Sequence, residues 1–330
     1  MNTSNKPDDT HDDPLAEADS SSTNHLPQSY SSSCSNSIPI LTIYNQFPLF
    51  LMEDWNSGIG GGLWSTGLAM AHYFTTSHFQ TQLLRLRSLR NDGESSSSSS
   101  SLRVLELGSG NGFLSVCLVV AAMMRPTSNS CITTKSKEPD PIIPIHVVAT
   151  DTASHLSLME RTIQSNLTRL SSTSSLDLAR FVTVQEYLWG DTFIGNNSSS
   201  NNFHSSGNTN TFDLIIGSDL AYRDDLHDPL IAALQHFHNI NETTPATTSS
   251  SPSTTSTAAT RITTTLLGVT MTDTKPIFFQ KLQQAGFGYE KLADHLLQPE
   301  FRGGGSRQFG IFVIYNNSNH KRMSLQSSSS

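Results

Sequence analysis

The sequence has few hydrophobic residues and no excess of positive charge. Only 35% of its 330 residues are hydrophobic. Much of this shortfall lies in low-complexity stretches, and one domain of roughly 220 residues remains once these are set aside, which is enough for a sizeable core. The net charge of −8 gives no electrostatic footprint for non-specific nucleic-acid binding. Nucleic acid is therefore disfavoured as a partner, although a local basic patch would escape this argument.

Cysteines are scarce, and long apolar runs are missing. Cys34, Cys117 and Cys131 form no C-x-x-C pair and no metal-ligand spacing, so we expect no metal and a reducing compartment. Cys117 lies in an apolar run and is expected to be a buried thiol. That run, residues 113–124, is too short to cross a bilayer, and the polar N-terminus shows no secretory signal. We expect no membrane partner and a cytoplasmic location, with the nucleus as an alternative.

Tracts rich in Ser, Thr and Asn divide the chain. The two ends, residues 1–36 and 317–330, are expected to be disordered because they have little to bury. Between them lies one domain, residues 37–316, with four insertions of similar composition at residues 95–101, 126–141, 196–210 and 241–260. Loops accept such insertions at small cost, because closure entropy grows only logarithmically with loop length.

Short apolar strands alternate with helices between these tracts. Strands are predicted at residues 102–107, 145–150, 181–184, 212–217 and 263–270, and helices at 112–124, 156–170, from Asp228 onward and at 276–285. Residues 288–293 and 309–315 follow without a convincing helix between them and are expected to form an antiparallel pair. The alternation predicts a Rossmann-like α/β fold, a seven-stranded and mainly parallel sheet with helices on both faces.

A glycine-rich turn, Glu106-Leu-Gly108-Ser-Gly110-Asn-Gly112, follows the first of these strands and opens a helix. Alternate glycines let the backbone turn tightly and approach a ligand, and the helix N-terminus offers free N–H groups. A dinucleotide fingerprint would need glycine where Phe113 stands, and a P-loop would need Gly-Lys-Ser/Thr. The spacing is instead similar to the E/D-x-G-x-G-x-G of S-adenosylmethionine enzymes. A purely structural turn is the alternative.

Asp151 ends the second of these strands. An acidic side chain at this place can bind both ribose hydroxyls of an adenosine. The insertion at residues 126–141 explains why it lies further along the chain than usual. The alternative interpretation is a cap for the helix that starts at Ala153, and both roles are compatible.

Four elements, in order, resemble the seven-β-strand protein lysine methyltransferases known as methyltransferase family 16. They are Gly62-Leu-Trp64 before a helical run, the glycine-rich turn, Trp189-Gly190, and the D-x-x-Y/F signature Asp219-Leu-Ala-Tyr222. The resemblance covers roughly residues 38–316 without the insertions. One departure is Tyr187, which stands two residues before Trp189 where the family usually has Leu.

The resemblance implies a class I methyltransferase with S-adenosylmethionine as cofactor and a protein substrate. It assigns Trp64 to closing over the cofactor, Glu106, Gly108, Gly110 and Gly112 to its methionine part, Asp151 to the ribose and Trp189 to the adenine. It assigns Asp219 and Tyr222 to the catalytic site where a substrate amine enters. The ordinary alternatives are a loop-capping role for Asp219 and packing roles for the three aromatic residues.

The leading functional hypothesis is a protein N-methyltransferase that acts on lysine. Alternatives are a small-molecule, arginine or histidine methyltransferase, and a catalytically silent methyltransferase-like binding module. The absence of Asn-Pro-Pro-Tyr after the fourth strand disfavours adenine or glutamine methylation. His227, His236 and His238 resemble no metal triad and are interpreted as surface or satisfied polar residues.

Overall fold

The computed structural model describes residues 38–91, 101–124, 142–172, 174, 176–191, 211–238, 262–302 and 308–318. The tails and insertions predicted from composition fall outside these ranges, except for Ser101, Asn317 and Ser318, so their disorder stays a prediction. In the described ranges, no helix is both long and apolar enough to cross a membrane.

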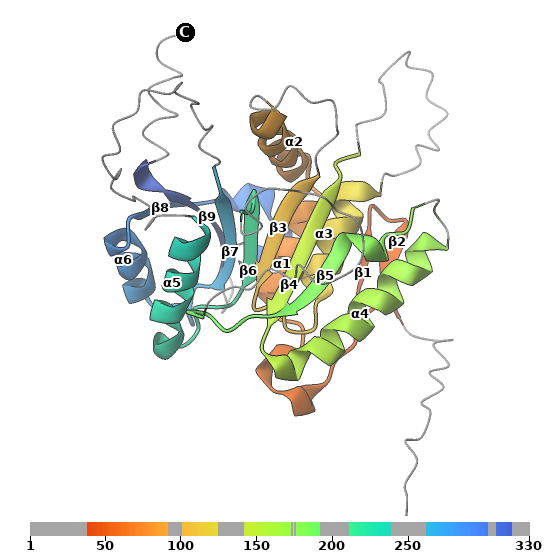
Figure 1. Ribbon diagram of the computed structural model, residues 1–330, viewed down its shortest axis with the longest axis horizontal. Helices are drawn as coiled ribbons and strands as arrows, with labels where there is room; N and C mark the ends of the chain where they lie inside the picture. Colours follow the sequence, from red (N-terminus) through yellow and green to blue (C-terminus); the bar gives the residue numbers. More distant parts are fainter. Residues whose placement is uncertain are drawn as a thin grey trace, which may run out of the picture. The chain divides into compact units, whose positions relative to one another are not determined.

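A seven-stranded sheet forms the centre of the domain (Figure 1). Its strands, in spatial order, are β5 (Val182–Glu186), β4 (Ile145–Asp151), β3 (Leu102–Leu107), β6 (Leu214–Ser218), β7 (Thr264–Thr270), β9 (Phe309–Asn316) and β8 (Phe287–Lys291). The first five are parallel, while β9 pairs antiparallel with both β7 and β8. The predicted fold class and the terminal antiparallel pair are confirmed.

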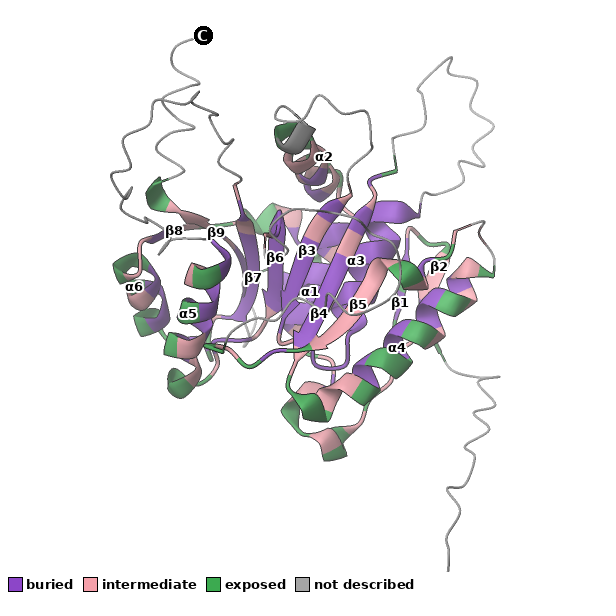
Figure 2. Cartoon of the chain, viewed as in Figure 1, coloured by how far each residue is buried: buried purple, intermediate pink, exposed green. Residues whose placement is uncertain are grey.

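Helices cover both faces of this sheet, because its strands are apolar on both sides. Val104 belongs to one buried cluster and its neighbour Leu105 to the other, as the two-residue period of a strand requires. The first cluster includes α1 (Ser65–Phe74), α3 (Phe113–Met123) and α4 (Ala153–Ser171), and the second includes α5 (His227–Phe237) and α6 (Pro276–Gln284). Figure 2 shows the consequence: α3 is buried throughout, while α4 is buried along one side only.

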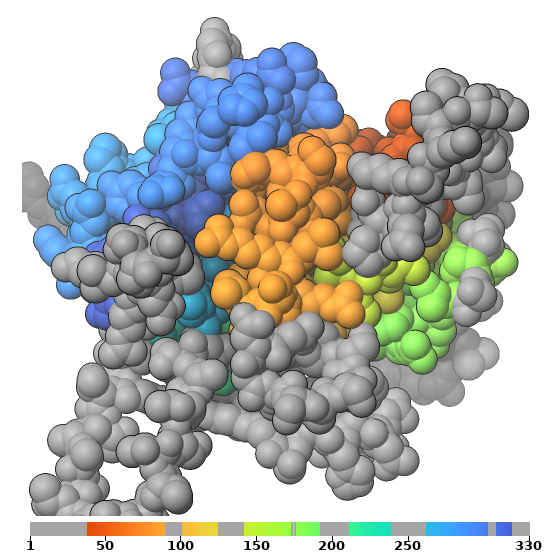
Figure 3. Space-filling view, turned by 90° about the horizontal axis from the view of Figure 1, so that it is seen from above, coloured from red at the N-terminus to blue at the C-terminus, as the bar shows by residue number. Residues whose placement is uncertain are grey.

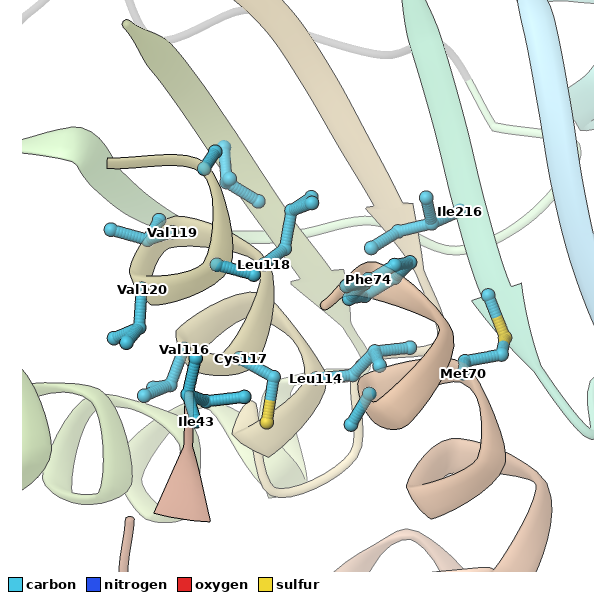
Figure 4. Close-up of a cluster of buried hydrophobic side chains, with 14 of the residues drawn as sticks. Ile43, Met70, Phe74, Leu114, Val116, Cys117, Leu118, Val119, Val120 and Ile216 are labelled. Carbon is cyan, nitrogen blue, oxygen red and sulfur yellow. The ribbon is translucent and has the colours of Figure 1, made fainter. Parts of the chain in front are cut away.

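The larger core is centred on α3, whose eleven residues are all buried. Its Val116 and Leu118 belong to one cluster with Met70 and Phe74 of α1 (Figure 4). Cys117 is fully buried in the same cluster, as predicted, and burial raises the pKa of its thiol. A thiol held protonated in this way is a packing group without nucleophilic reactivity.

The elements of the described chain that were not predicted include a hairpin and a helix. A hairpin joins β1 (Leu41–Ile43) to β2 (Phe47–Leu49), and Tyr44 and Asn45 in its turn have positive φ. The helix α2 (Ser77–Asn91) forms the orange surface in Figure 3, beside the blue C-terminal part of the chain. Both elements are short or mostly polar, and so they show little hydrophobic periodicity.

Parallel strands bring their carboxyl ends to one edge of the sheet. Gly108 follows β3, Asp151 ends β4, and Asp219 follows β6. These three strands are direct neighbours. Ligands of open α/β sheets bind at this edge, near the point where the strand order reverses.

Candidate active site

The glycine-rich turn between β3 and α3 depends on left-handed backbone. Gly108, Gly110 and Gly112 have φ of 59°, 55° and 76°, values that other residues adopt only at a cost. A β-carbon at Gly110 would lie 2.5 Å from the carbonyl oxygen of Gly60, so the turn also touches the segment before α1. The amide of Ser109 donates to the carbonyl of Thr150 and ties the turn to β4.

Glu106 lies beneath this turn and is almost fully buried. Its carboxyl group forms a short hydrogen bond with the hydroxyl of Ser115 in α3. Burial raises the pKa of Glu106 to about 8, and the hydroxyl groups of Ser115 and Ser109 only partly offset this. The group is therefore mainly protonated at neutral pH, a state that its sequence position does not reveal.

Asp151 connects the turn to α4. One carboxylate oxygen accepts the amide of Gly110 at 2.7 Å. The other accepts the amide of Thr152 at 2.7 Å and lies 2.7 Å from Nδ1 of His155. Its side chain is about 11% exposed, so one acid fixes the glycine turn, the start of α4 and a histidine together.

Asp219 stands in an unusual backbone conformation, with φ of 53°. Its amide donates to the carbonyl of Gly268, and its Oδ1 accepts the amide of Thr270 at 2.8 Å. Burial raises the pKa of the Asp219 carboxyl, while hydrogen bonds from Thr66 and Thr270 lower it in part. Asp219 therefore also has the loop-capping role that was its alternative interpretation.

The turn from Asp219 to Tyr222 is held from below by His227, which was expected to be a surface or satisfied polar residue. It is buried and only partly satisfied: its Nε2 lies 3.1 Å from the carbonyl oxygen of Ala221, while its Nδ1 has no hydrogen-bond partner among the described residues. A carbonyl only accepts hydrogen bonds, so this nitrogen donates. His238 is likewise buried, with Nε2 2.9 Å from the hydroxyl of Thr265.

All three tryptophans of the chain lie near this edge of the sheet. Trp64 is 41% exposed, donates its indole N–H to the carbonyl of Ile59 and meets Trp55 edge to face. Trp189 lies so close to Gly108 that a β-carbon there would be 3.2 Å from its ring. Tyr187 packs against Phe237 and also lines the cavity, so the departure from the family pattern leaves Trp189 at the cavity.

A cavity of about 780 Å³ unites most of the predicted residues. Its lining includes Trp64, Glu106, Gly108, Gly110, Asp151, Trp189, Asp219 and Tyr222. Gly112 is not among the lining residues. It is the residue before α3, and a β-carbon there would lie 2.6 Å from Met159 and 3.2 Å from Ile163 of α4. Its place in the structure is thus explained by close helix packing.

The polar lining residues missed from the sequence include His155, Asn111, Ser218 and Asp273. The side chains of Asn111 and Ser218 each carry a buried polar atom, Nδ2 and Oγ, with no hydrogen-bond partner among the described residues. Such atoms usually have partners, and at a cavity wall a bound ligand can provide them. Only the place of Asn111 within the glycine-rich turn could have indicated it. In the described ranges, no cluster of His, Cys, Asp and Glu is suited to a metal.

Comparison with known proteins agrees with this geometry. The model of a lysine methyltransferase family, methyltransferase family 16, matches residues 44–257. Among curated proteins, none matches this chain.

Solved structures show only weak overall similarity. Precorrin-6y C5,15-methyltransferase from Geobacter metallireducens is 10% identical, with 73% of this chain and 89% of that chain covered and a TM-score of 0.33. The ribosomal protein L11 methylase from Lactobacillus delbrueckii is 13% identical, with coverage of 73% and 80% and a TM-score of 0.33. The N-terminal domain of human METTL16 in complex with SAH is 9% identical, with coverage of 72% and 68% and a TM-score of 0.36. Similarity of this degree carries no information about substrate.

Proposed function

The chain belongs to the lysine methyltransferase family whose pattern covers residues 44–257, and we propose that this S-adenosylmethionine-dependent methyltransferase modifies the side-chain amine of a lysine in a protein substrate. The observation that carries the choice of substrate is the charge of the cavity. Asp151, Asp219 and Asp273 line it, Glu106 beside them is mainly protonated and adds no charge, and neither lysine nor arginine is found among its described lining residues.

The chemistry of the cavity lining supports cofactor binding. Gly108 and Gly110 line the cavity, and a β-carbon at either would collide with Leu220 or with the carbonyl oxygen of Gly60, so the turn presents backbone to the cavity. Asn111 and Ser218 line it too, with polar side-chain atoms that have no hydrogen-bond partner among the described residues. We assign Trp64, Glu106, Gly108, Gly110 and Trp189 to cofactor binding and Asp151 to the ribose hydroxyls. Gly112 supports this set by holding α3 close to α4.

The same charge pattern favours an amine over an anionic substrate. Carboxylates in a partly enclosed cavity attract a cation and repel phosphate groups. Nucleic acid carries one negative charge per nucleotide and is usually bound through Lys and Arg, which this lining lacks among its described residues. A slender protonated amine is therefore the side chain that the cavity selects best.

The chain's own residues have a limited chemical task. When bound, S-adenosylmethionine supplies a methyl group already activated on a sulfonium ion. Asp219 and Tyr222 must present a neutral amine in line with that group and help exclude water. The Asp219 carboxylate accepts an N–H of the amine, and its raised pKa makes it the better proton acceptor. The ammonium group that the cavity attracts would lose one proton to Asp219 before its nitrogen can act as a nucleophile, and Asp219 would pass that proton to water.

Labelled S-adenosylmethionine, a cell lysate and the purified protein test this proposal directly. We expect a labelled protein band whose acid hydrolysate contains methyllysine, and a Gly110→Arg variant provides the matched blank. Methylarginine or methylhistidine without methyllysine would refute the substrate and leave the cofactor intact. Label in small molecules alone would point to a small-molecule enzyme.

A further inference from the structure

His155 lies between two groups that can only accept hydrogen bonds. Its Nδ1 is 2.7 Å from Oδ1 of Asp151, and its Nε2 is 2.9 Å from the carbonyl oxygen of Ser57. The ring bridges α4 to the segment before α1, and its bond to the Asp151 carboxylate is charge-assisted. The side chain is about 12% exposed, which shields this charge-assisted bond from water.

Ser57 belongs to a glycine-rich loop, residues 54–62, that includes η1 (Trp55–Ser57) and η2 (Ile59–Gly61). The loop closes on itself through the amide of Asp54, which donates to the carbonyl of Gly61. It contains four glycines, so ordering it costs much backbone entropy. A firm attachment to the body of the domain is needed to hold it in one conformation.

The loop rests on the histidine ring as well as on the glycine-rich turn. A β-carbon at Gly60 would lie 2.7 Å from Cε1 of His155, and the carbonyl oxygen of Gly60 lies against Gly110. Ile59, Gly60 and Gly62 then line the cavity together with Trp64. One wall of the cavity therefore depends on how this loop is seated.

We propose that His155 is a positioning residue of the cofactor site, because it fastens the loop of residues 54–62 to Asp151. A continuous chain of bonds runs from the amide of Gly110 through Asp151 and His155 to Ser57. These bonds fix the positions of the glycine-rich turn, the Asp151 carboxylate and the loop of residues 54–62 relative to one another before the cofactor binds. Preorganisation of this kind increases affinity by reducing the ordering cost of binding.

The test compares His155→Phe with Ser154→Ala in the full-length protein. Phenylalanine keeps a ring under Gly60 but cannot donate, while Ser154 is an exposed neighbour outside the cavity lining. For His155→Phe without cofactor, we expect amide hydrogen exchange at residues 54–63 to become at least ~10-fold faster, with β3 and α3 unchanged. By calorimetry, we expect S-adenosylhomocysteine to bind ~10-fold more weakly, and the turnover rate at saturating cofactor to change less than ~3-fold. Ser154→Ala should match the wild type.

Gly60→Ala attacks the same contact from the other side. Gly60 does not have the left-handed φ that makes alanine costly, so the closeness of the His155 ring is what resists the methyl group. We expect faster exchange in the loop and weaker binding for this variant also. If both variants keep wild-type loop exchange and bind within ~2-fold of wild type, the proposal is overturned. If His155→Phe loses protection throughout the domain, Gly60→Ala alone decides. Hydrogen exchange and S-adenosylhomocysteine binding need no methyl acceptor, so a wrong lysine assignment would leave these two readouts intact.

Discussion

Oδ1 of Asp219 accepts the backbone amide of Thr270 at 2.8 Å, so the acid of the D-x-x-Y signature also fastens the end of β7. The same carboxyl group lines the cavity. Its structural and chemical roles therefore overlap in one side chain, and substitutions must separate them.

Asp219→Ala is expected to reduce methyl transfer at least about a hundredfold, roughly 3 kcal/mol in transition-state terms. It also removes the bond to Thr270, which should lower the free energy of unfolding by about 1 kcal/mol. Asp219→Asn keeps an acceptor oxygen and a residue type that tolerates left-handed backbone, so it should lose activity with a smaller loss of stability. Kinetics and denaturant unfolding measure the two effects.

The control for Asp219 is Asp213→Asn, because Asp213 directly precedes β6 while Asp219 directly follows it. Asp213 is a buried acid that accepts the amide of Arg103 at 2.7 Å and lies outside the cavity lining. It should affect stability with little change in turnover per folded molecule. Near-normal turnover in Asp219→Asn would remove the charge of Asp219 from the mechanism.

Gly110→Arg should abolish binding of S-adenosylmethionine and its demethylated product. A β-carbon at this left-handed position already meets the carbonyl oxygen of Gly60 at 2.5 Å, and a long side chain would enter the cavity. Calorimetry on the wild type should show binding of both compounds and none of NAD. Micromolar NAD binding together with no response to S-adenosylmethionine would contradict the cofactor assignment.

Glu106 should make the stability of the cofactor-free protein depend on pH. Its pKa is raised from 4.5 to about 8 by burial, so between these values the folded state holds a proton that the unfolded state has released. Stability from this group is thus lost as pH rises through that window, with a slope of at most about 1.4 kcal/mol per pH unit. Denaturant unfolding from pH 5 to 8 should show this slope, and Glu106→Gln should flatten it. An unchanged slope in the variant would assign the dependence to other groups.

Local sequence signals were sufficient to predict the strands of the sheet and the site residues that stand at their carboxyl ends. Strand β3 is found where Leu102–Leu107 predicted it, and Gly108, Asp151 and Asp219 follow neighbouring strands because each ends an apolar run. The contact of His155 with Ser57 spans 98 residues and has no local signature. Asp273 likewise reaches the cavity only through the packing of β7 beside β6.

Removal of residues 1–36 together with 241–260 should leave cooperative unfolding intact. Neither segment has apolar residues at a useful period, so neither is expected to supply a face of the core. Thermal unfolding followed by circular dichroism should give one sharp transition for the double deletion. A broad or missing transition would show that one of these segments contributes to the folded domain.

Asp273→Asn should weaken the productive binding of a lysine-bearing substrate without weakening cofactor binding. Asp273 is exposed, lines the cavity and lies near enough to Asp219 to raise the pKa of that carboxyl. Its charge can therefore attract an approaching ammonium group. The residues assigned to cofactor binding belong to other parts of the chain, so their contacts with the cofactor should not change. We expect KM for the protein substrate to rise roughly 3- to 10-fold at low salt, and the effect to shrink as ionic strength shortens the range of the interaction.

Asp225→Asn is the matched control, because Asp225 is an exposed acid paired with Arg223 outside the cavity lining. Equal KM values for both variants at low salt would mean that the acidity of the cavity mouth does not select the substrate. A rise in the dissociation constant for S-adenosylhomocysteine in Asp273→Asn would instead place this acid in the cofactor site.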